Sequence, residues 1–348
     1  MPNDKFLLIK AFGWGFWADM DHLVGQLLAA ELTNRIPVVY WGPNSLYSES
    51  MSTNAFELYY EPVSNYTIWD IARPGFTFYP PIWNYKNLMV EDLDKIANAY
   101  RNLGGMMSSD ADVVVSDVHH FARFFMFFIK KDHWTYGMTP LLICRQLIKK
   151  YLKLKPDIVM EIEEFSNAHF RDGEPILGVH VRGTDKILEV YNLSQFNKRY
   201  HAEIKKFLDK YDVRKIFLST DTQEVLDEYK RLYGSMIIST DCGRGSGIST
   251  DIAPHVKDYA DRRRKGIEIL KDTYLATKCD FFVGNGYSNV SFFVNRLKDW
   301  PESHISLLYN TLEQERKVAK RRTKTEMVRR RTREIEHRLD YPELYGGV

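Results

Sequence analysis

The sequence predicts an α/β protein built on parallel, doubly wound sheets. The first observation is a regular alternation of short apolar strands and longer helices between residues 176 and 297, which is the pattern of consecutive βα units. The second is a strand, helix and strand within the first 41 residues. A chain of 348 residues, 44% of them hydrophobic, is long enough for two domains of this kind.

The N-terminal half begins with a predicted strand at Lys5–Lys10 and a turn at Gly13-Trp14-Gly15. An amphipathic helix is expected at about 21–33 and a second strand at 37–41. A Gly-x-Gly turn is a weak signal, because a tight turn without a ligand explains it equally well. We expect one βα unit with a flexible loop at the ligand edge of its sheet.

Residues 44 to about 110 are rich in Tyr, Trp, Asn and Pro, as at Tyr59-Tyr60, Trp69 and Trp83. A long segment without regular structure is usually functional when it is ordered. Aromatic faces beside polar groups suit sugar rings, but packing within an irregular insertion explains any one ring at least as well. The sequence leaves both interpretations open.

A domain boundary is expected near residues 152–174, where Lys155-Pro156 separates two predicted helices. The elements expected before the second half are a strand at 112–117 and helices at 121–128, 141–152 and 158–170. We therefore predict an N-terminal domain at 1–152 that carries the aromatic insertion, a C-terminal domain at 153–310 and a tail at 311–348.

The second half is expected to alternate strands and helices up to a last helix that begins near Ser288. The expected strands are 176–181, 215–219, 236–238 and 280–283, and the expected helices are 194–209, 223–233 and 262–277.

Charge and cysteine content argue against several classes of protein. The net charge of +2 points to no polyanionic partner for the chain as a whole. Cys144, Cys242 and Cys279 lie far apart, fit no metal-binding spacing and are expected to be reduced.

The sequence begins without an apolar leader, and its most apolar stretch, 124–129, is far too short to span a bilayer. We expect a cytoplasmic protein.

The stretch 313–339 is expected to form a long basic helix, with eleven Lys or Arg residues against five Glu. A solvated helix lying across the body of the protein is one interpretation. The other is peripheral contact with an anionic membrane surface or with a lipid-linked acceptor.

Polar side chains follow every predicted strand of the second half. If the sheet is parallel, these side chains lie along one edge and can converge on one ligand. Each has a plainer explanation when it is taken singly, because Asp221 and Ser288 are natural helix N-caps and Asp241 is a natural turn residue. The recurrence at successive strand ends favours a site, formed by His180, Arg182, Asp185 and Lys186, by Thr220 and Asp221, by Asp241, and by Gly286, Ser288 and Asn289.

A nucleoside diphosphate fits this set of side chains. Arg182 would pair with one phosphate, and Ser288 with adjacent N–H groups would bind the other at a helix N-terminus. Asp241 could accept hydrogen bonds from N1 and N2 of guanine, and adenine offers no such pair of donors. The sequence therefore favours a guanine nucleotide.

Residues 178–186, Gly-Val-His-Val-Arg-Gly-Thr-Asp-Lys, resemble the His-Val-Arg-Arg-Thr-Asp-Lys motif of the α1,6-fucosyltransferases, a family that includes the NodZ-type enzymes and the core fucosyltransferase. The similarity continues at 216–221, 238–241 and 272–289, and these four ordered segments cover roughly residues 155–297.

The resemblance implies a GT-B-like fold, with two Rossmann-like domains that face a cleft, and inverting transfer from GDP-fucose with no metal and no cofactor. By motif position, His180 and Asp241 would hold the guanosine and Arg182 the β-phosphate. The other donor-binding candidates are Gly13, Gly15, Asp185, Lys186, Asp221, Gly286, Tyr287, Ser288 and Asn289.

Two departures from the motif matter. Gly183 replaces the family's second arginine, and Val190 replaces its glutamate, with Glu189 one position earlier. The general base is therefore open between Glu189 and an aspartate of the first loop, Asp19 or Asp21. The candidate catalytic residues are Arg182, Glu189 and Asp21.

The expected function is metal-independent transfer of L-fucose from GDP-fucose to a hydroxyl of a glycan or glycolipid. Asp110-Ala111-Asp112 and Asp19-Met20-Asp21 both lie in the wrong context for a metal-binding Asp-x-Asp, and no Walker A loop is present. GDP-mannose remains an alternative donor. A protein of another class, which binds an anionic surface or nucleic acid through its basic tail, would leave the polar strand ends unexplained, and we expect no nucleic-acid partner.

Overall fold

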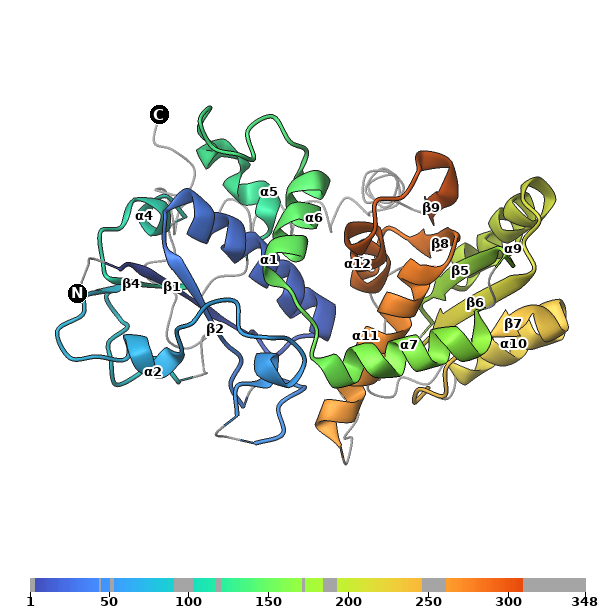
Figure 1. Ribbon diagram of the computed structural model, residues 1–348, viewed down its shortest axis with the longest axis horizontal. Coiled ribbons are helices and arrows are strands. Elements are labelled where there is room, and N and C mark those ends of the chain that lie inside the picture. The colour runs from blue at the N-terminus through green and yellow to red at the C-terminus, as the bar shows by residue number, and fades with distance from the viewer. Residues whose placement is uncertain are drawn as a thin grey trace, which may run out of the picture.

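Two parallel β-sheets organise the chain, as the alternating pattern predicts (Figure 1). The structure is a computed structural model that describes residues 4–43, 45–50, 53–90, 103–116, 120–170, 173–183, 193–245 and 261–308. The first sheet lies in the N-terminal half and the second in the C-terminal half, with helices α11 (Arg262–Lys278) and α12 (Asn289–Leu297) between them (Figure 1).

The first sheet has the strand order β2-β1-β4-β3. All its pairings are parallel, and the central strand β1 pairs Leu8 with Val38 on one side and with Val115 on the other. Helix α1 (Phe16–Leu32) follows β1 and is buried along most of its length. The strands are β1 (Phe6–Lys10), β2 (Ile36–Tyr40), β3 (Phe78–Tyr79) and β4 (Val113–Ser116).

The second sheet has the order β7-β6-β5-β8-β9 and is also parallel throughout. The chain leaves the centre at β5 in one direction toward β7 and then returns to β8 on the other side. The crevice outside the carboxyl ends of such a switch point is where open α/β sheets bind ligands. The strands are β5 (Ile176–Val181), β6 (Lys215–Thr220), β7 (Ile237–Ile238), β8 (Phe281–Asn285) and β9 (Ile305–Leu308).

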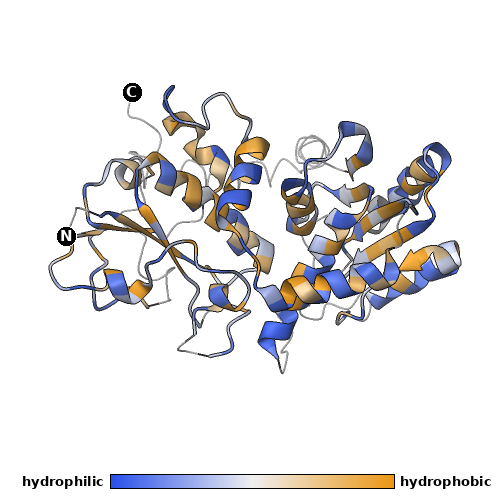
Figure 2. Ribbon diagram, viewed as in Figure 1, coloured by the Kyte–Doolittle hydropathy of each residue, from blue (hydrophilic) through white to orange (hydrophobic). Residues whose placement is uncertain are grey.

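The helices of the second half cover the sheet as the sequence periodicity predicts, with α9 (Leu193–Lys210) and α10 (Gln223–Tyr233) on the crossovers. Apolar residues line the strands, while the outer faces of these helices are polar (Figure 2). The chain enters this half through α6 (Pro140–Tyr151) and α7 (Pro156–His169). Both helices start at a proline, which fits the first turn because its missing N–H is unpaired there in any case.

Several predicted boundaries are wrong. Helix α1 begins at Phe16, five residues before the expected start, because Gly15 is its N-cap and the following side chains are buried. The predicted helix at 121–128 is a short helix α5 (Ala122–Phe125) followed by a 3₁₀ turn at Met126–Phe128. The predicted strand at 236–238 is shortened by a 3₁₀ turn at Gly234–Met236.

The aromatic segment at 44–110 is more structured than the sequence suggests. It contains the 3₁₀ turn Ala55–Leu58, helix α2 (Ile68–Ile71), strand β3 and helix α4 (Leu103–Ser108). Tyr59, Tyr60 and Trp83 are at most 2% exposed, so these three rings pack in the core and offer no surface to a sugar. Trp69 remains 71% exposed.

One continuous core joins the two halves. The ring of Trp17 in α1 stacks on Phe293 of α12 with ring centroids 4.3 Å apart, and its Nε1 donates to Thr273 of α11 at 2.9 Å. Tyr59 packs so closely on α11 that a Cβ added at Gly266 would lie 2.4 Å from its ring. Helix α1 and the aromatic segment are therefore fixed against the helices of the second half.

The predicted division at 152/153 falls in the link between α6 and α7, and it stays a prediction, as does the tail at 311–348, which lies outside the described residues. None of the helices in the described part of the chain is both long enough and apolar enough to cross a bilayer.

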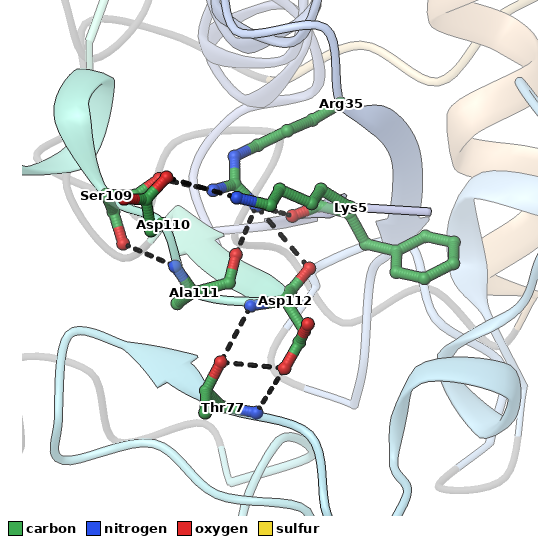
Figure 3. Close-up of polar contacts among 8 residues, drawn as sticks. Lys5, Arg35, Thr77, Ser109, Asp110, Ala111 and Asp112 are labelled. Atoms are coloured by element: carbon green, nitrogen blue, oxygen red, sulfur yellow. Dashed lines mark hydrogen bonds and ion pairs between the residues drawn. The ribbon is translucent and has the colours of Figure 1, made fainter. Parts of the chain in front are cut away.

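Arg35 ties the strands of the first sheet together at the edge opposite their carboxyl ends (Figure 3). Arg35 is 6% exposed, and its guanidinium donates to the backbone carbonyls of Ala111 at 2.7 Å and Ser109 at 2.6 Å, with longer contacts to Phe6 and Asp112. The preceding Asn34 has a φ of 52°, in the left-handed region that ends the turn after α1. Arg35 thus satisfies carbonyls of the segment that leads into β4.

We predict that Arg35→Met lowers the free energy of unfolding by about 2–3 kcal/mol, because buried carbonyls lose their donor. Chemical denaturation monitored by circular dichroism measures this change. Lys5→Ala is the matched control, because Lys5 forms an ion pair with a fully exposed carboxylate, Asp110, and such pairs contribute about 0–1 kcal/mol. Equal effects of the two substitutions would contradict a structural role for Arg35.

Candidate functional site

A cavity of about 100 Å³ lies along the carboxyl ends of β5, β6 and β7. Side chains that follow the strands form one wall, and side chains of α11 form the other. The lining residues are His180, Arg182, Ser219, Thr220, Asp221, Cys242, Gly243, Lys265, Glu268, Ile269, Asp272, Thr273 and Val290. The structure therefore brings together four of the predicted site residues, His180, Arg182, Thr220 and Asp221, at the predicted edge.

His180 lies at the end of β5, next to the switch point. Its side chain is 4% exposed, and Nδ1 lies 2.8 Å from Oγ of Ser291 on α12. Burial lowers the pKa of His180 to about 4, so the ring is neutral at physiological pH. A neutral imidazole carries one donor and one acceptor nitrogen, which suits a polar neutral group of a ligand.

The backbone at His180 is held by a short chain of hydrogen bonds. Its carbonyl accepts from the hydroxyl of Tyr200 at 2.8 Å, and that hydroxyl accepts from Nδ2 of Asn285 at 2.8 Å. All of these residues are buried. The hydrogen bonds link β5, α9 and β8 next to His180, which lines the cavity.

Asp221 clamps the turn that follows β5. Its Oδ2 lies 3.1 Å from Nε of Arg182, and its Oδ1 accepts from the backbone N–H of Gly183 at 2.8 Å. The carboxylate therefore fixes both the side chain and the backbone of the turn. The plainer alternative for Asp221, a helix N-cap, does not apply, because the N-cap of α10 is Thr222.

Gly183 leaves no room for a side chain. A Cβ at this position would lie 2.7 Å from Oγ1 and 2.9 Å from Cγ2 of Thr222, which is itself 3% exposed. Gly183 stands where the family motif has its second arginine, and the side chain of Thr222 fills the space that a side chain at this position would need.

Asp272 of α11 is a buried carboxylate on the wall of the cavity that was not among the predicted site residues. It is 7% exposed and accepts from Oγ1 of Thr240 at 2.6 Å and from Oγ of Ser219 at 3.0 Å. Burial raises its pKa. An acidic residue on the face that helical periodicity buries, between Leu270 and Leu275, was the available signal.

Lys265, Glu268 and Cys242 also line the cavity and were not predicted. Lys265 is 5% exposed. Glu268 accepts from the backbone N–H of Gly243 at 3.0 Å, which holds the loop after β7 against α11. The thiol of Cys242 lies 3.5 Å from Oδ2 of Asp272.

Asp241, the predicted guanine acceptor, is exposed and does not line the cavity. The chain direction after β7 turns its neighbour Cys242 inward instead. The carboxylate that lines the cavity next to Cys242 is therefore Asp272 and not Asp241.

The four candidates after β8 lie at the switch point but not on the cavity wall. Gly286 and Ser288 are buried, Tyr287 is half-buried and Asn289 is exposed. Ser288 is the N-cap position of α12, as predicted, although its side chain makes no capping hydrogen bond.

The glycine turn of the first half is held by Asp19. Gly13 has a φ of 74°, and the Asp19 carboxylate accepts from the backbone N–H groups of Phe12 at 3.0 Å and Trp14 at 3.3 Å. Burial raises the pKa of Asp19 to about 7. Gly15 caps α1, and Trp17 in its first turn donates to Thr273 of the cavity wall, but the predicted donor-binding residues Gly13 and Gly15 do not themselves line the cavity.

The candidates for the general base in the first half, Asp19 and Asp21, were predicted to lie in a loop, but both lie in helix α1. Asp21 is 5% exposed and its Oδ1 accepts from Nη1 of Arg296 on α12 at 2.7 Å. Both carboxylates are engaged in holding structure together. Asp185, Lys186 and Glu189 lie outside the described residues.

No group of three or more His, Cys, Asp or Glu side chains within the described ranges is arranged to hold a metal ion. The backbone N–H of His120 donates to Nδ1 of the buried His22 at 3.3 Å.

Comparison with known proteins identifies the fold and the family that the chain resembles. Residues 133–297 match the family described as alpha-(1,6)-fucosyltransferase N- and catalytic domains. The solved fucosyltransferase NodZ from Bradyrhizobium aligns with a TM-score of 0.55 at 21% identity, over 84% of this chain and 92% of that chain. POFUT1 in complex with GDP aligns with a TM-score of 0.53 at 14% identity, over 89% and 99% of the two chains. No curated protein sequence matches the chain significantly.

These matches confirm the predicted GT-B-like α/β fold and the resemblance to the α1,6-fucosyltransferases. The family match spans the end of the first half and most of the second, which includes the cavity wall from His180 to Val290. Together, the family match and the fold indicate a glycosyltransferase.

We predict that the protein becomes less stable as the pH is lowered from 6.5 to 4, because His180 is buried in its neutral form. The unfolded histidine, with its usual pKa of 6.5, binds a proton in this range and the folded one does not, so the folded state loses up to roughly 3 kcal/mol by pH 4. Chemical denaturation of the protein and of His180→Gln at several pH values isolates this contribution. The stability advantage of histidine over glutamine should shrink as the pH falls, and a constant difference would contradict the buried neutral ring.

Proposed function

We propose that this fucosyltransferase-like glycosyltransferase moves a sugar, L-fucose, from a GDP carrier to a hydroxyl of a glycan or glycolipid, with inversion and without a metal. The observation that carries the proposal is the cavity at the switch point of the second sheet, where the clamped Arg182 and the buried Asp272 line one space. A cation and a buried carboxylate in one cavity suit the two ends of a guanosine diphosphate.

The structural neighbours support a guanine nucleotide. NodZ has been solved after soaking with GDP-fucose, and POFUT1 in complex with GDP. Their fold is the fold of this chain, and the corresponding half carries the family motifs. GDP-mannose is the alternative donor, because the nucleotide end of the cavity would hold both sugars equally.

We assign Asp272 to the binding of the guanine ring. N1–H and the N2 amino group of guanine are two adjacent donors, and a carboxylate accepts both. The groups that contact Asp272 are the hydroxyls of Ser219 and Thr240 and the thiol of Cys242, all of which can rotate toward other acceptors when a ligand enters. The neutral ring of His180 is available for a further polar contact.

Arg182 is the residue we assign to the leaving group. In an inverting displacement, the acceptor hydroxyl oxygen bonds to the anomeric carbon while the bond from that carbon to the β-phosphate oxygen breaks. Negative charge then develops on the departing diphosphate, and a guanidinium fixed in advance stabilises it most in the transition state. Asp221 provides this fixation at 3.1 Å from Nε.

The acceptor hydroxyl must lose its proton to a base. Asp21 is paired with Arg296 and buried, and Asp19 already accepts from two backbone N–H groups, so neither carboxylate is placed to serve. Glu189, which lies outside the described residues, remains the candidate. The stretch 313–339 remains the candidate for contact with an anionic membrane or a lipid-linked acceptor.

We expect GDP and GDP-fucose to raise the melting temperature of the protein, and ADP and UDP to leave it unchanged, equally with and without EDTA. Ligands that bind only the folded state stabilise it in proportion to their affinity, so a thermal-shift series measures selectivity directly. Stabilisation by GDP that disappears with EDTA would contradict metal independence. Equal stabilisation by ADP would contradict the guanine assignment.

A matched pair of variants checks which carboxylate binds guanine. Asp272→Asn should weaken GDP binding by roughly 10- to 100-fold, because an amide presents a donor where guanine also presents one. Asp241→Asn, on the neighbouring exposed carboxylate, should bind GDP like the unmodified protein. The reverse result would restore the assignment made from sequence.

We expect Arg182→Ala to lower the rate of GDP release from GDP-fucose in the presence of a glycan acceptor by at least roughly 10²-fold. Arg214→Ala is the control, since Arg214 is exposed and pairs with Asp212 on the surface away from the cavity. Turnover of Arg182→Ala close to that of the unmodified enzyme would show that another group stabilises the diphosphate.

A further inference from the structure

Lys265 is a buried cation on the wall of the donor cavity. It lies in the first turns of α11, 5% exposed, and its ammonium lies 5.4 Å from the centroid of the Tyr47 ring. Tyr47 is itself fully buried, and its hydroxyl accepts from the backbone N–H of Phe16 at 2.9 Å, where α1 begins. Both halves of the molecule therefore position this lysine.

The charges of the cavity wall leave a role for a second cation. Its described lining includes three carboxylates, Asp221, Glu268 and Asp272, against two cations, Arg182 and Lys265. Asp221 lies 3.1 Å from Arg182 and offsets much of its charge. A diphosphate brings at least two negative charges, and one arginine already paired with a carboxylate balances them only in part.

The turn after β5 cannot supply that second charge from the position next to Arg182. A side chain at Gly183 would collide with Thr222 at 2.7 Å, so a cation there requires Thr222 to move. Among the described residues of the cavity wall, the positive charge besides Arg182 comes from α11.

Burial of an ammonium on a cavity wall is costly unless anions or ring faces surround it. The face of Tyr47 contributes part of the compensation, and a phosphate group entering the cavity adds an anion beside the lysine. A phosphate in the cavity would thus meet a cation that the fold already holds on the wall.

We propose that Lys265 is a second phosphate-binding residue, which contacts the diphosphate together with Arg182 and makes the cavity selective for nucleoside diphosphates over monophosphates and nucleosides. The assignment rests on the proposed function, because it concerns the same guanosine diphosphate site. In this assignment one phosphate-binding side chain, Arg182, comes from the strand side of the cavity, and the other, Lys265, comes from the helix side.

Isothermal titration of GDP, GMP and guanosine tests the assignment. Lys265→Met should weaken GDP binding by roughly 10- to 100-fold, while guanosine binding should stay within about twofold, because only the phosphate contact is lost. Lys265→Arg should keep most of the GDP affinity. Lys271→Met is the matched control on the same helix, since the ammonium of Lys271 lies over Phe165 and does not line the cavity.

Two results would overturn the assignment. Unchanged GDP binding by Lys265→Met would mean that the lysine does not reach the phosphates, and an equal loss for GDP and guanosine would mean that it only supports α11. Lys265→Gln provides a second neutral variant with the same readout in case methionine disturbs the fold. If the unmodified protein binds no GDP, the proposed function itself fails, whereas GDP binding that is insensitive to position 265 removes only the role of the lysine.

Discussion

The parallel pairing of β5 between β6 and β8 is the constraint on which the candidate site depends. Its register sets His180 opposite Ser219 and Val181 opposite Thr220, so the residues that follow β5 and β6 emerge together at one edge of the sheet. Asp221 can then reach back to Arg182 and to the backbone of Gly183. A slip of one residue in this pairing would turn these side chains to opposite faces and remove the cavity wall.

The second constraint is the packing of α1 against α11 and α12. Trp17 stacks on Phe293 and donates to Thr273, and Asp21 pairs with Arg296, so the first turns of α1 are held at the helices that bound the cavity. Asp19 holds the glycine turn immediately before them. The loop that the first half contributes is therefore fixed relative to the cavity of the second half, and under the proposed function this favours a defined geometry between acceptor and donor.

Burial shifts the titrating groups of these two regions in opposite directions. It lowers the pKa of His180, so this ring is neutral, and the cations of the described cavity lining are Arg182 and Lys265. It raises the pKa of Asp19 to about 7. The contribution of Asp19 to stability is therefore fully present below its usual pKa of 3.8 and is lost as the pH rises through 7, which opposes the trend set by His180.

Local sequence patterns determined much of the fold because hydrophobic periodicity and turn residues act within a few residues of each other. The strands β1, β5 and β6, the helices α6, α7, α10 and α11, and the placement of His180, Arg182 and Asp221 at one edge all follow from them. The short strands β3 and β9 did not, since two to four residues carry too little pattern and are defined by the strands they pair with.

Only the tertiary structure decided which carboxylate faces the cavity, because residues from separate elements meet there. Asp241 follows a strand and looks like a ligand in sequence, yet it is exposed, while Asp272 lies 30 residues beyond Cys242 on a helix and packs against it. Two further contacts between separate elements could not be seen in the sequence. Lys265 lines the cavity from α11, and the side chain of Thr222 fills the space beside Gly183. Sequence determines which faces are buried, but distances between faces depend on how the helices pack on the sheet, and that packing sums many weak contacts along the whole chain.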